Sequence, residues 1–198
     1  MARTRPIRLI LVLLVAFALA SCSKSSASTF SGAELHVPYH VPTTQLTDTS
    51  GAPFSLTGTG KRLTLIFFGY THCPDECPTT MATLASAMLQ LDAADRADVQ
   101  VVFVTTDPAR DTRPVVRDWL DKFDPDFTGV TGPLATITKV ARAVGVPILK
   151  GRRLPSGGYD VTHGTQVLGE DGSHTVPVVW TLGTTAPEFV HDIHQLLS

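Results

Sequence analysis

Runs of apolar residues divide the chain into an ordered series of predicted strands and helices. Residues 63–68 and 99–104 are continuous apolar runs of strand length, which predicts strands buried on both faces. Apolar side chains recur at helical spacing in residues 78–92 and 132–144, and a capping threonine followed by proline opens a helix at 112–122. Strand, helix, strand and two further helices in this order predict a layer of parallel strands covered by helices.

The two ends of the globular region carry shorter runs separated by turn residues. Residues 44–56 surround a Ser-Gly turn and predict a small N-terminal hairpin. Residues 164–168 and 175–180 are short apolar runs joined by Gly-Glu-Asp-Gly-Ser, which predicts an antiparallel hairpin, and Pro187 begins a last amphipathic helix. The predicted fold class is α/β, with a central mixed sheet flanked by helices, and this arrangement resembles the thioredoxin-like fold.

The first residues resemble an export signal. Three arginines precede the 12-residue apolar stretch 9–20, which is short for a membrane span, since a span needs about 20 residues. The stretch ends in Leu-Ala-Ser-Cys, which resembles a bacterial lipobox and implies cleavage before Cys22 and lipid attachment to its sulfur. An ordinary secretory signal with an unrelated cysteine is the alternative.

This reading divides the chain into three parts. We expect a lipoprotein signal peptide at residues 1–21, a lipidated flexible tether at 22–43 and a single thioredoxin-like domain at 44–198. Small polar residues at 23–31 suit a tether. The expected location is the extracytoplasmic face of a bacterial cell membrane.

Charge argues against one class of partner. Removal of residues 1–21 takes away three arginines and no acids, which leaves 13 basic against 18 acidic side chains and a net charge of −5. A basic footprint for nucleic acid is therefore absent from the composition of the expected mature chain.

Cys73 and Cys77 lie four positions apart, directly after the first buried run. The pair falls where a strand is followed by a helix, and a helix N-terminus favours the thiolate form of cysteine. Lipid attachment to Cys22 leaves these two as the remaining thiols of three. An exported chain with one such pair has no disulfide framework, so the pair is expected to bind a metal or to form a redox-active disulfide.

Three segments together resemble the Sco/SenC family of copper-handling proteins. They are the cysteine segment 68–80, the Thr-Asp-Pro-Ala-Arg-Asp-Thr segment 106–112 and Thr-His-Gly at 162–164, and the resemblance covers residue 53 to the C-terminus. It implies copper binding by Cys73, Cys77 and His163. This ligand set suits copper, because Cu(I) favours thiolates and an added imidazole makes the site acceptable to Cu(II). The resemblance also implies delivery of copper to an extracytoplasmic protein, above all a haem-copper oxidase subunit, and a reductant for the thiols.

His163 lies 86 residues after Cys77 and is expected to approach it through the fold. The family usually has aspartate before this histidine, whereas the chain has Thr162. The sequence therefore does not show which group accepts from the second ring nitrogen, a partner that ligating histidines normally have. The other histidines away from the motif are expected to be ordinary surface residues; they are His36, His40, His174, His191 and His194.

Each group of charged residues near the cysteines allows two interpretations, a role at the site or an ordinary surface charge. Asp75 and Glu76 can modulate the thiols or can be solvated acids at a helix start, where negative charge is favoured; neither is chosen as a ligand, and nor is the adjacent His72. Asp107, Arg110 and Asp111 can support the copper-binding segment or a docking partner, but a local ion pair that closes the turn is the favoured interpretation.

A cysteine pair also occurs in thiol-disulfide oxidoreductases, peroxiredoxins and structural zinc sites. A thiol-disulfide oxidoreductase would use Cys73 for attack and Cys77 for resolution, although such proteins generally have Cys-x-x-Cys. A peroxiredoxin would need threonine in place of Tyr70 and proline in place of Ile66. A structural zinc site would need a fourth ligand that the sequence does not offer.

Overall fold

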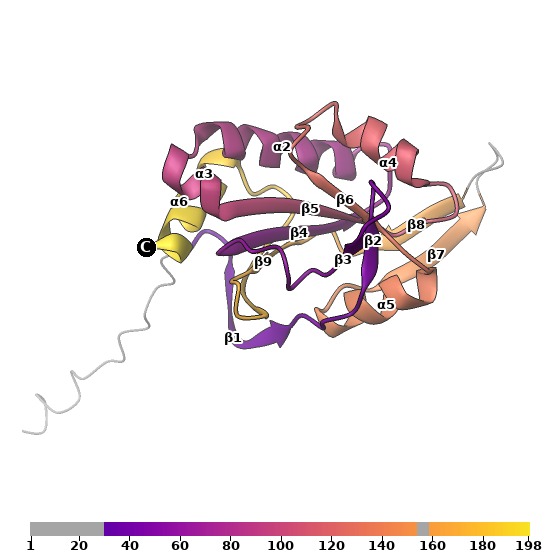
Figure 1. The fold of residues 1–198 in the computed structure, drawn as a ribbon, viewed down its shortest axis with the longest axis horizontal. Helices are drawn as coiled ribbons and strands as arrows, with labels where there is room; N and C mark the ends of the chain where they lie inside the picture. The colour runs from indigo at the N-terminus through magenta and orange to yellow at the C-terminus, as the bar shows by residue number, and fades with distance from the viewer. Residues whose placement is uncertain (1–29, 154–158) are drawn as a thin grey trace, which may run out of the picture.

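The computed structural model describes residues 30–153 and 159–198 (Figure 1). Its centre is an eight-stranded mixed sheet in the order β1-β10-β9-β4-β5-β6-β2-β3, and β7 and β8 form a separate two-stranded sheet. The strands are β1 (Ala33–His40), β2 (Leu46–Asp48), β3 (Pro53–Phe54), β4 (Leu63–Gly69), β5 (Val99–Thr105), β6 (Thr128–Thr131), β7 (Ile148–Arg153), β8 (Tyr159–His163), β9 (Val167–Glu170) and β10 (Thr175–Trp180).

Helices cover both faces of the sheet. They are α2 (Glu76–Gln90), α3 (Ala93–Asp98), α4 (Arg113–Leu120), α5 (Leu134–Ala143) and α6 (Ala186–Leu197). Alternation along β4 assigns one core to each face. Leu65 and Phe67 pack in the core that includes α2, α4 and α6, whereas Ile66 and Phe68 pack in the core that includes α5. In Figure 1, α2, α3, α4 and α6 lie on one side of the strands and α5 on the other.

The parallel pair β4 and β5 determines where the loops meet. Its register runs from Leu63 opposite Val99 to Gly69 opposite Thr105, so both strands end at the same edge of the sheet. The loop from β4 to α2 contains Cys73, and the loop from β5 to α4 contains residues 106–112. Two of the three segments that resemble the Sco/SenC pattern therefore begin side by side.

The predicted fold class is confirmed. Both long apolar runs form strands, β4 and β5, and the 44–56 region forms the hairpin β2–β3. The later hairpin is β9–β10, and the expected helices correspond to α2, α4, α5 and α6. The short helix α3, the four-residue strand β6 and the β7–β8 pair were not predicted.

The expected tether is too long at its C-terminal end. Residues 33–40, placed in the 22–43 tether, form β1, which pairs antiparallel with β10 at the edge of the sheet. The side chains of β1 are exposed or half-buried, so this strand is held by backbone pairing and shows no apolar run. The cleavage site, Cys22 and the first part of the tether lie outside the described residues. No helix of the described chain has the length and apolar character that crossing a bilayer requires.

Candidate metal centre

The two cysteines lie where the loop after β4 enters α2. We call residues 70–75 the cysteine loop. Cys73 is half-buried and closes a turn, because its amide donates to the Tyr70 carbonyl at 3.2 Å. Cys77 is buried in the first turn of α2, and its amide donates to the Cys73 sulfur at 3.3 Å. The sequence therefore places one thiol toward solvent and one in the core.

Gly69 makes room for the buried sulfur. A Cβ on Gly69 would lie 3.1 Å from Cys77 Sγ and under 3.0 Å from ring atoms of Phe67 and Phe103. A side chain at position 69 would thus displace either the aromatic core or the thiol. The absence of a Cβ is a requirement of close packing at this point.

His163 ends β8 and reaches the cysteines across the fold. Its Nε2 lies 3.5 Å from Cys77 Sγ, and its ring meets those of Tyr70 and Phe67 edge-on, at centroid distances of 5.7 and 6.2 Å. Its Nδ1 lies 2.8 Å from the carbonyl oxygen of Gly164. A carbonyl oxygen can only accept, so Nδ1 carries the proton and Nε2 presents its lone pair to the sulfur. The missing partner of the second ring nitrogen is therefore a backbone carbonyl, which no side-chain pattern could reveal.

The two thiols differ in acidity. A hydrogen bond from the Cys77 thiol, the largest cause, acts with the Asp75 and Cys77 amides against burial and lowers the pKa of Cys73 to about 4. Cys77 shifts the other way: the neighbouring Cys73 thiolate and burial raise its pKa far above the ordinary value. The half-exposed sulfur is therefore the nucleophilic thiolate of the pair.

A pocket of about 330 Å³ opens onto the site. Its lining consists of Tyr70, Cys73, Pro74, Asp75, Glu76, Val161 and His163. Asp75 and Glu76 are exposed and give the mouth of this pocket negative charge. Neither contributes a side-chain cap to α2, although Asp75 occupies the N-cap position.

The three predicted ligands lie near one another, but their ligand atoms are not all within 4.8 Å of each other. Cys77 contacts both Cys73 and His163. In the described chain, the group of three potential ligands whose atoms all lie within 4.8 Å of one another is instead Asp92, Asp95 and His194. That group is explained by a helix cap and an ion pair: Asp92 accepts from two amides of α3, and His194 contacts Asp95 at 2.8 Å.

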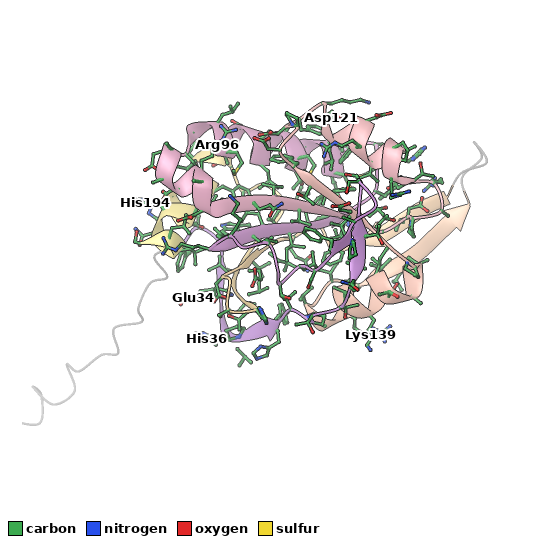
Figure 2. All side chains as sticks on the ribbon, viewed as in Figure 1. Glu34, His36, Arg96, Asp121, Lys139 and His194 are labelled. Atoms are coloured by element: carbon green, nitrogen blue, oxygen red, sulfur yellow. The ribbon has the colours of Figure 1, made fainter. Side chains whose placement is uncertain are left out.

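The remaining histidines lie away from the pocket. His36 and His40 are exposed on β1, and His174 adopts a left-handed conformation in the β9–β10 turn. His36 and His194 lie at the outer surface (Figure 2). His72 is exposed beside Cys73, but its Nδ1 faces the Thr71 hydroxyl at 3.1 Å and Asp111 at 3.6 Å, not the thiols.

The interpretation of residues 107–111 as a local ion pair is correct for two of the three residues. Arg110 pairs with Asp107. Asp111 does not close this turn with its side chain: it is fully buried and accepts hydrogen bonds from Thr71, 40 residues earlier. Sequence proximity pointed to Arg110 as its partner, whereas the parallel register of β4 and β5 brings Thr71 to it.

Comparisons with known proteins agree with this arrangement. The SCO1/SenC family model matches residues 36–198. A Stutzerimonas stutzeri protein that is named as copper-binding is 35% identical over 135 residues, 67% of this chain and 66% of that protein. Human "Protein SCO1 homolog, mitochondrial" is 34% identical over 62% of this chain and 45% of its own length. The chain thus matches less than two thirds of the length of these curated relatives.

Solved structures of similar proteins share the fold over nearly their whole length. Apo Sco1 from Thermus thermophilus has a TM-score of 0.76 and 29% identity, covering 87% of this chain and 99% of that one. ScoI from Bradyrhizobium japonicum with copper bound has a TM-score of 0.69 and 31% identity, covering 81% and 98%. By the extent of the family match and by its fold, the chain belongs to the SCO1/SenC family.

Proposed function

We propose that this protein is a lipid-anchored copper chaperone that carries copper on Cys73, Cys77 and His163 outside the cytoplasm. The observation that carries the proposal is the imidazole geometry: the Gly164 carbonyl holds the proton on Nδ1, so the Nε2 lone pair is directed at the Cys77 sulfur at 3.5 Å. Two thiolates and one imidazole form a ligand set that copper accepts in both oxidation states.

The unequal burial of the ligands suggests an order of exchange. Cys73 lines the pocket and is half-buried, whereas Cys77 lies in the core. An incoming copper ion would meet the Cys73 thiolate and His163 first and then Cys77, with a small inward movement, since the three ligand groups are not yet closed to within 4.8 Å. Release would also begin on the solvent side, as ligands of a recipient replace Cys73 before the buried Cys77 sulfur.

The recipient and the anchor rest on the family and on the sequence. A solved relative is described as a member of the Sco family of cytochrome c oxidase assembly proteins, and another as a SCO1/SenC family lipoprotein. A haem-copper oxidase subunit is therefore the proposed recipient, and lipid on Cys22 the proposed anchor. The cycle further needs a thiol reductant, because a Cys73–Cys77 disulfide cannot bind copper.

An anaerobic copper titration of the reduced full chain in detergent tests the proposal. We expect one tightly bound copper per chain, and loss of tight binding in Cys73→Ser and Cys77→Ser. His163→Ala should weaken Cu(II) binding severely, because an imidazole ligand is lost. His36→Ala is the matched control, since it removes an exposed histidine far from the pocket. Unchanged copper binding in His163→Ala would contradict the ligand assignment.

Thiol-disulfide exchange is the second candidate, and the asymmetry of the thiols favours it. The Cys73 thiolate would attack a target disulfide and release one target thiolate; Cys77 would then attack the mixed disulfide, leaving the target reduced and Cys73–Cys77 oxidised. Electrons from a reductant would restore the pair. His163→Ala separates the two functions, because it should leave this exchange nearly intact. Loss of exchange together with copper binding would contradict that division.

A further inference from the structure

Asp111 is a buried carboxylate that joins the two loops at the edge of the sheet. Its Oδ2 accepts hydrogen bonds from the Thr71 amide at 2.9 Å and the Thr105 hydroxyl at 2.7 Å, and its Oδ1 accepts one from the Thr71 hydroxyl at 2.6 Å. A buried carboxylate is tolerated where donors replace the lost water, and such charge-assisted bonds are short and strong. Two of the three donors belong to Thr71, so Asp111 fixes this residue against the end of β5.

Thr71 stands two residues before Cys73 in the cysteine loop. Gly69, the last residue before this loop, is also held by the segment after β5, because the Thr106 amide and hydroxyl donate to the Gly69 carbonyl at 2.7 and 3.0 Å. The Cys73 amide then closes back onto Tyr70. With Gly69 and Thr71 both fixed, few backbone torsions remain that could move the Cys73 sulfur.

The loop after β5, residues 106–112, also approaches His163 through the Tyr70 ring. The Arg110 guanidinium lies over the Tyr70 ring, 5.8 Å from its centroid, within the range of a cation–π contact. The Tyr70 ring in turn meets His163 edge-on at 5.7 Å. Residues 106–112 therefore adjoin the thiol side of the site through Asp111 and the imidazole side through Arg110.

We propose that Asp111 is a positioning residue for the copper ligands, which acts through Thr71 to hold Cys73 beside Cys77 and His163. The inference rests on the proposed copper function. Asp111 binds Thr71 and Thr105 and not the proposed ligands, so it acts on the loop. The neighbouring Asp107 and Arg110 form an ion pair with each other.

Three variants separate positioning from a general contribution to stability. Asp111→Ala removes both acceptor oxygens and with them all three hydrogen bonds. Asp111→Asn is the conservative variant: its carbonyl can accept from the Thr71 amide and Thr105, and its amide can donate to the Thr71 hydroxyl, which is able to accept. Asp192→Asn is the matched control, because Asp192 is equally buried but binds Ser31, Gly32, Trp180 and His191.

The readouts follow the loop and the metal separately in the full chain. Hydrogen exchange of the Thr71 amide, measured without metal, reports the contact with Asp111. The rate of Cu(I) loss to a chelator and the thiolate-to-Cu(II) absorption report the ligand geometry. In Asp111→Ala we expect at least tenfold faster exchange at Thr71, about 10-fold or greater weakening of copper binding and a shifted absorption band. Asp111→Asn should restore all three, and Asp192→Asn should leave the copper readouts unchanged.

Two results would overturn the proposal. One is an Asp111→Ala protein that exposes the Thr71 amide yet keeps the copper affinity and spectrum of the unsubstituted chain. The other is an Asp192→Asn protein with the same copper defect, which would show a general effect of lost stability. If Asp111→Ala does not fold, Thr71→Val removes the hydroxyl contacts with Asp111 and His72, keeps the amide bond to Asp111 and should change the copper readouts in the same direction. No change would refute the role. Absence of copper binding in the unsubstituted chain would instead refute the proposed function, and Thr71 exchange would still decide whether Asp111 holds the cysteine loop.

Discussion

Two buried aspartates organise two distant regions of this molecule with the same chemistry. Asp111 accepts hydrogen bonds from Thr71 and Thr105 beside the candidate metal centre. Asp192, on α6, accepts from the amides of Ser31 and Gly32 at 2.9 and 2.8 Å and from the Trp180 indole at 2.7 Å. Both side chains are fully excluded from solvent.

The difference lies in what the donors are attached to. Asp192 joins the start of the described chain, the edge of the sheet and the last helix, so its bonds hold the fold together over 160 residues of sequence. Asp111 joins a loop to the strand beside it, and that loop carries a proposed ligand. A buried carboxylate thus supplies global stability in one region and local position in the other, according to the segments it connects.

Substitution by asparagine should give the largest difference in stability between the two sites. Asp192 accepts from backbone and indole N–H groups, whereas two of the three donors to Asp111 are hydroxyls. In Asp192→Asn, the amide oxygen can keep the bonds from Gly32 and Trp180, but the new NH2 group faces the Ser31 amide, which cannot accept and loses its partner. We expect a loss of about 1–3 kcal/mol in the free energy of unfolding. Asp111→Asn should cost less than about 1 kcal/mol, because a hydroxyl can reverse its role.

Urea unfolding of the two variants and the unsubstituted chain, at neutral pH and without metal, measures the difference. Equal losses in the two variants would contradict the assignment of acceptors and donors. A larger loss in Asp111→Asn would show that the loop contact, and not the α6 contact, supports the fold.

Much of the central fold could be predicted because burial leaves a continuous apolar signal. The strands β4 and β5 are buried almost throughout and were recognised as apolar runs. β1 could not be recognised in this way, since exposed side chains such as Val37 and His40 line a strand that is held by backbone bonds to β10. β6 has only four residues, too few to show a period.

The candidate site also contains residues that the sequence indicates and contacts that only the fold reveals. Cys73, Cys77 and His163 could be proposed from their motifs, and the fold brings Cys73 and His163 into contact with the buried Cys77. The carbonyl that orients His163 could not, because every residue has one. A local ion pair among Asp107, Arg110 and Asp111 is what sequence proximity predicts, whereas the bond of Asp111 to Thr71 depends on the register of two parallel strands.

Gly69→Ala should perturb the site region by overpacking. The added Cβ would lie 2.8 Å from a Phe103 ring atom and 3.1 Å from Cys77 Sγ. Overpacking of a dense core costs about 1–3 kcal/mol, and here it should also displace the buried thiol and weaken copper binding. Gly58→Ala is the matched control, because its Cβ would meet only Ser55 atoms at ordinary distances of 3.7 and 3.9 Å. Thermal unfolding and copper titration of both variants test this, and a Gly69→Ala protein as stable as Gly58→Ala would contradict the packing argument.

The smallest expected effect is a convergence of stability curves at acid pH. Burial opposes ionisation of Asp192, but hydrogen bonds from His191, the Ser31 and Gly32 amides and Trp180 outweigh it and hold the pKa below its usual value. A carboxyl with a lowered pKa in the folded state contributes stability above its unfolded value of about 4, and this contribution is lost as the pH falls through the folded pKa. Protonated Asp192 resembles asparagine, so the stability advantage of the unsubstituted chain over Asp192→Asn should be constant from pH 7 to about 5 and should shrink below about pH 4. Urea midpoints measured across this range for both proteins give the comparison. An advantage that stays constant down to the acid limit of folding would mean that the ionised form of Asp192 is not what holds Ser31 and Gly32 to α6.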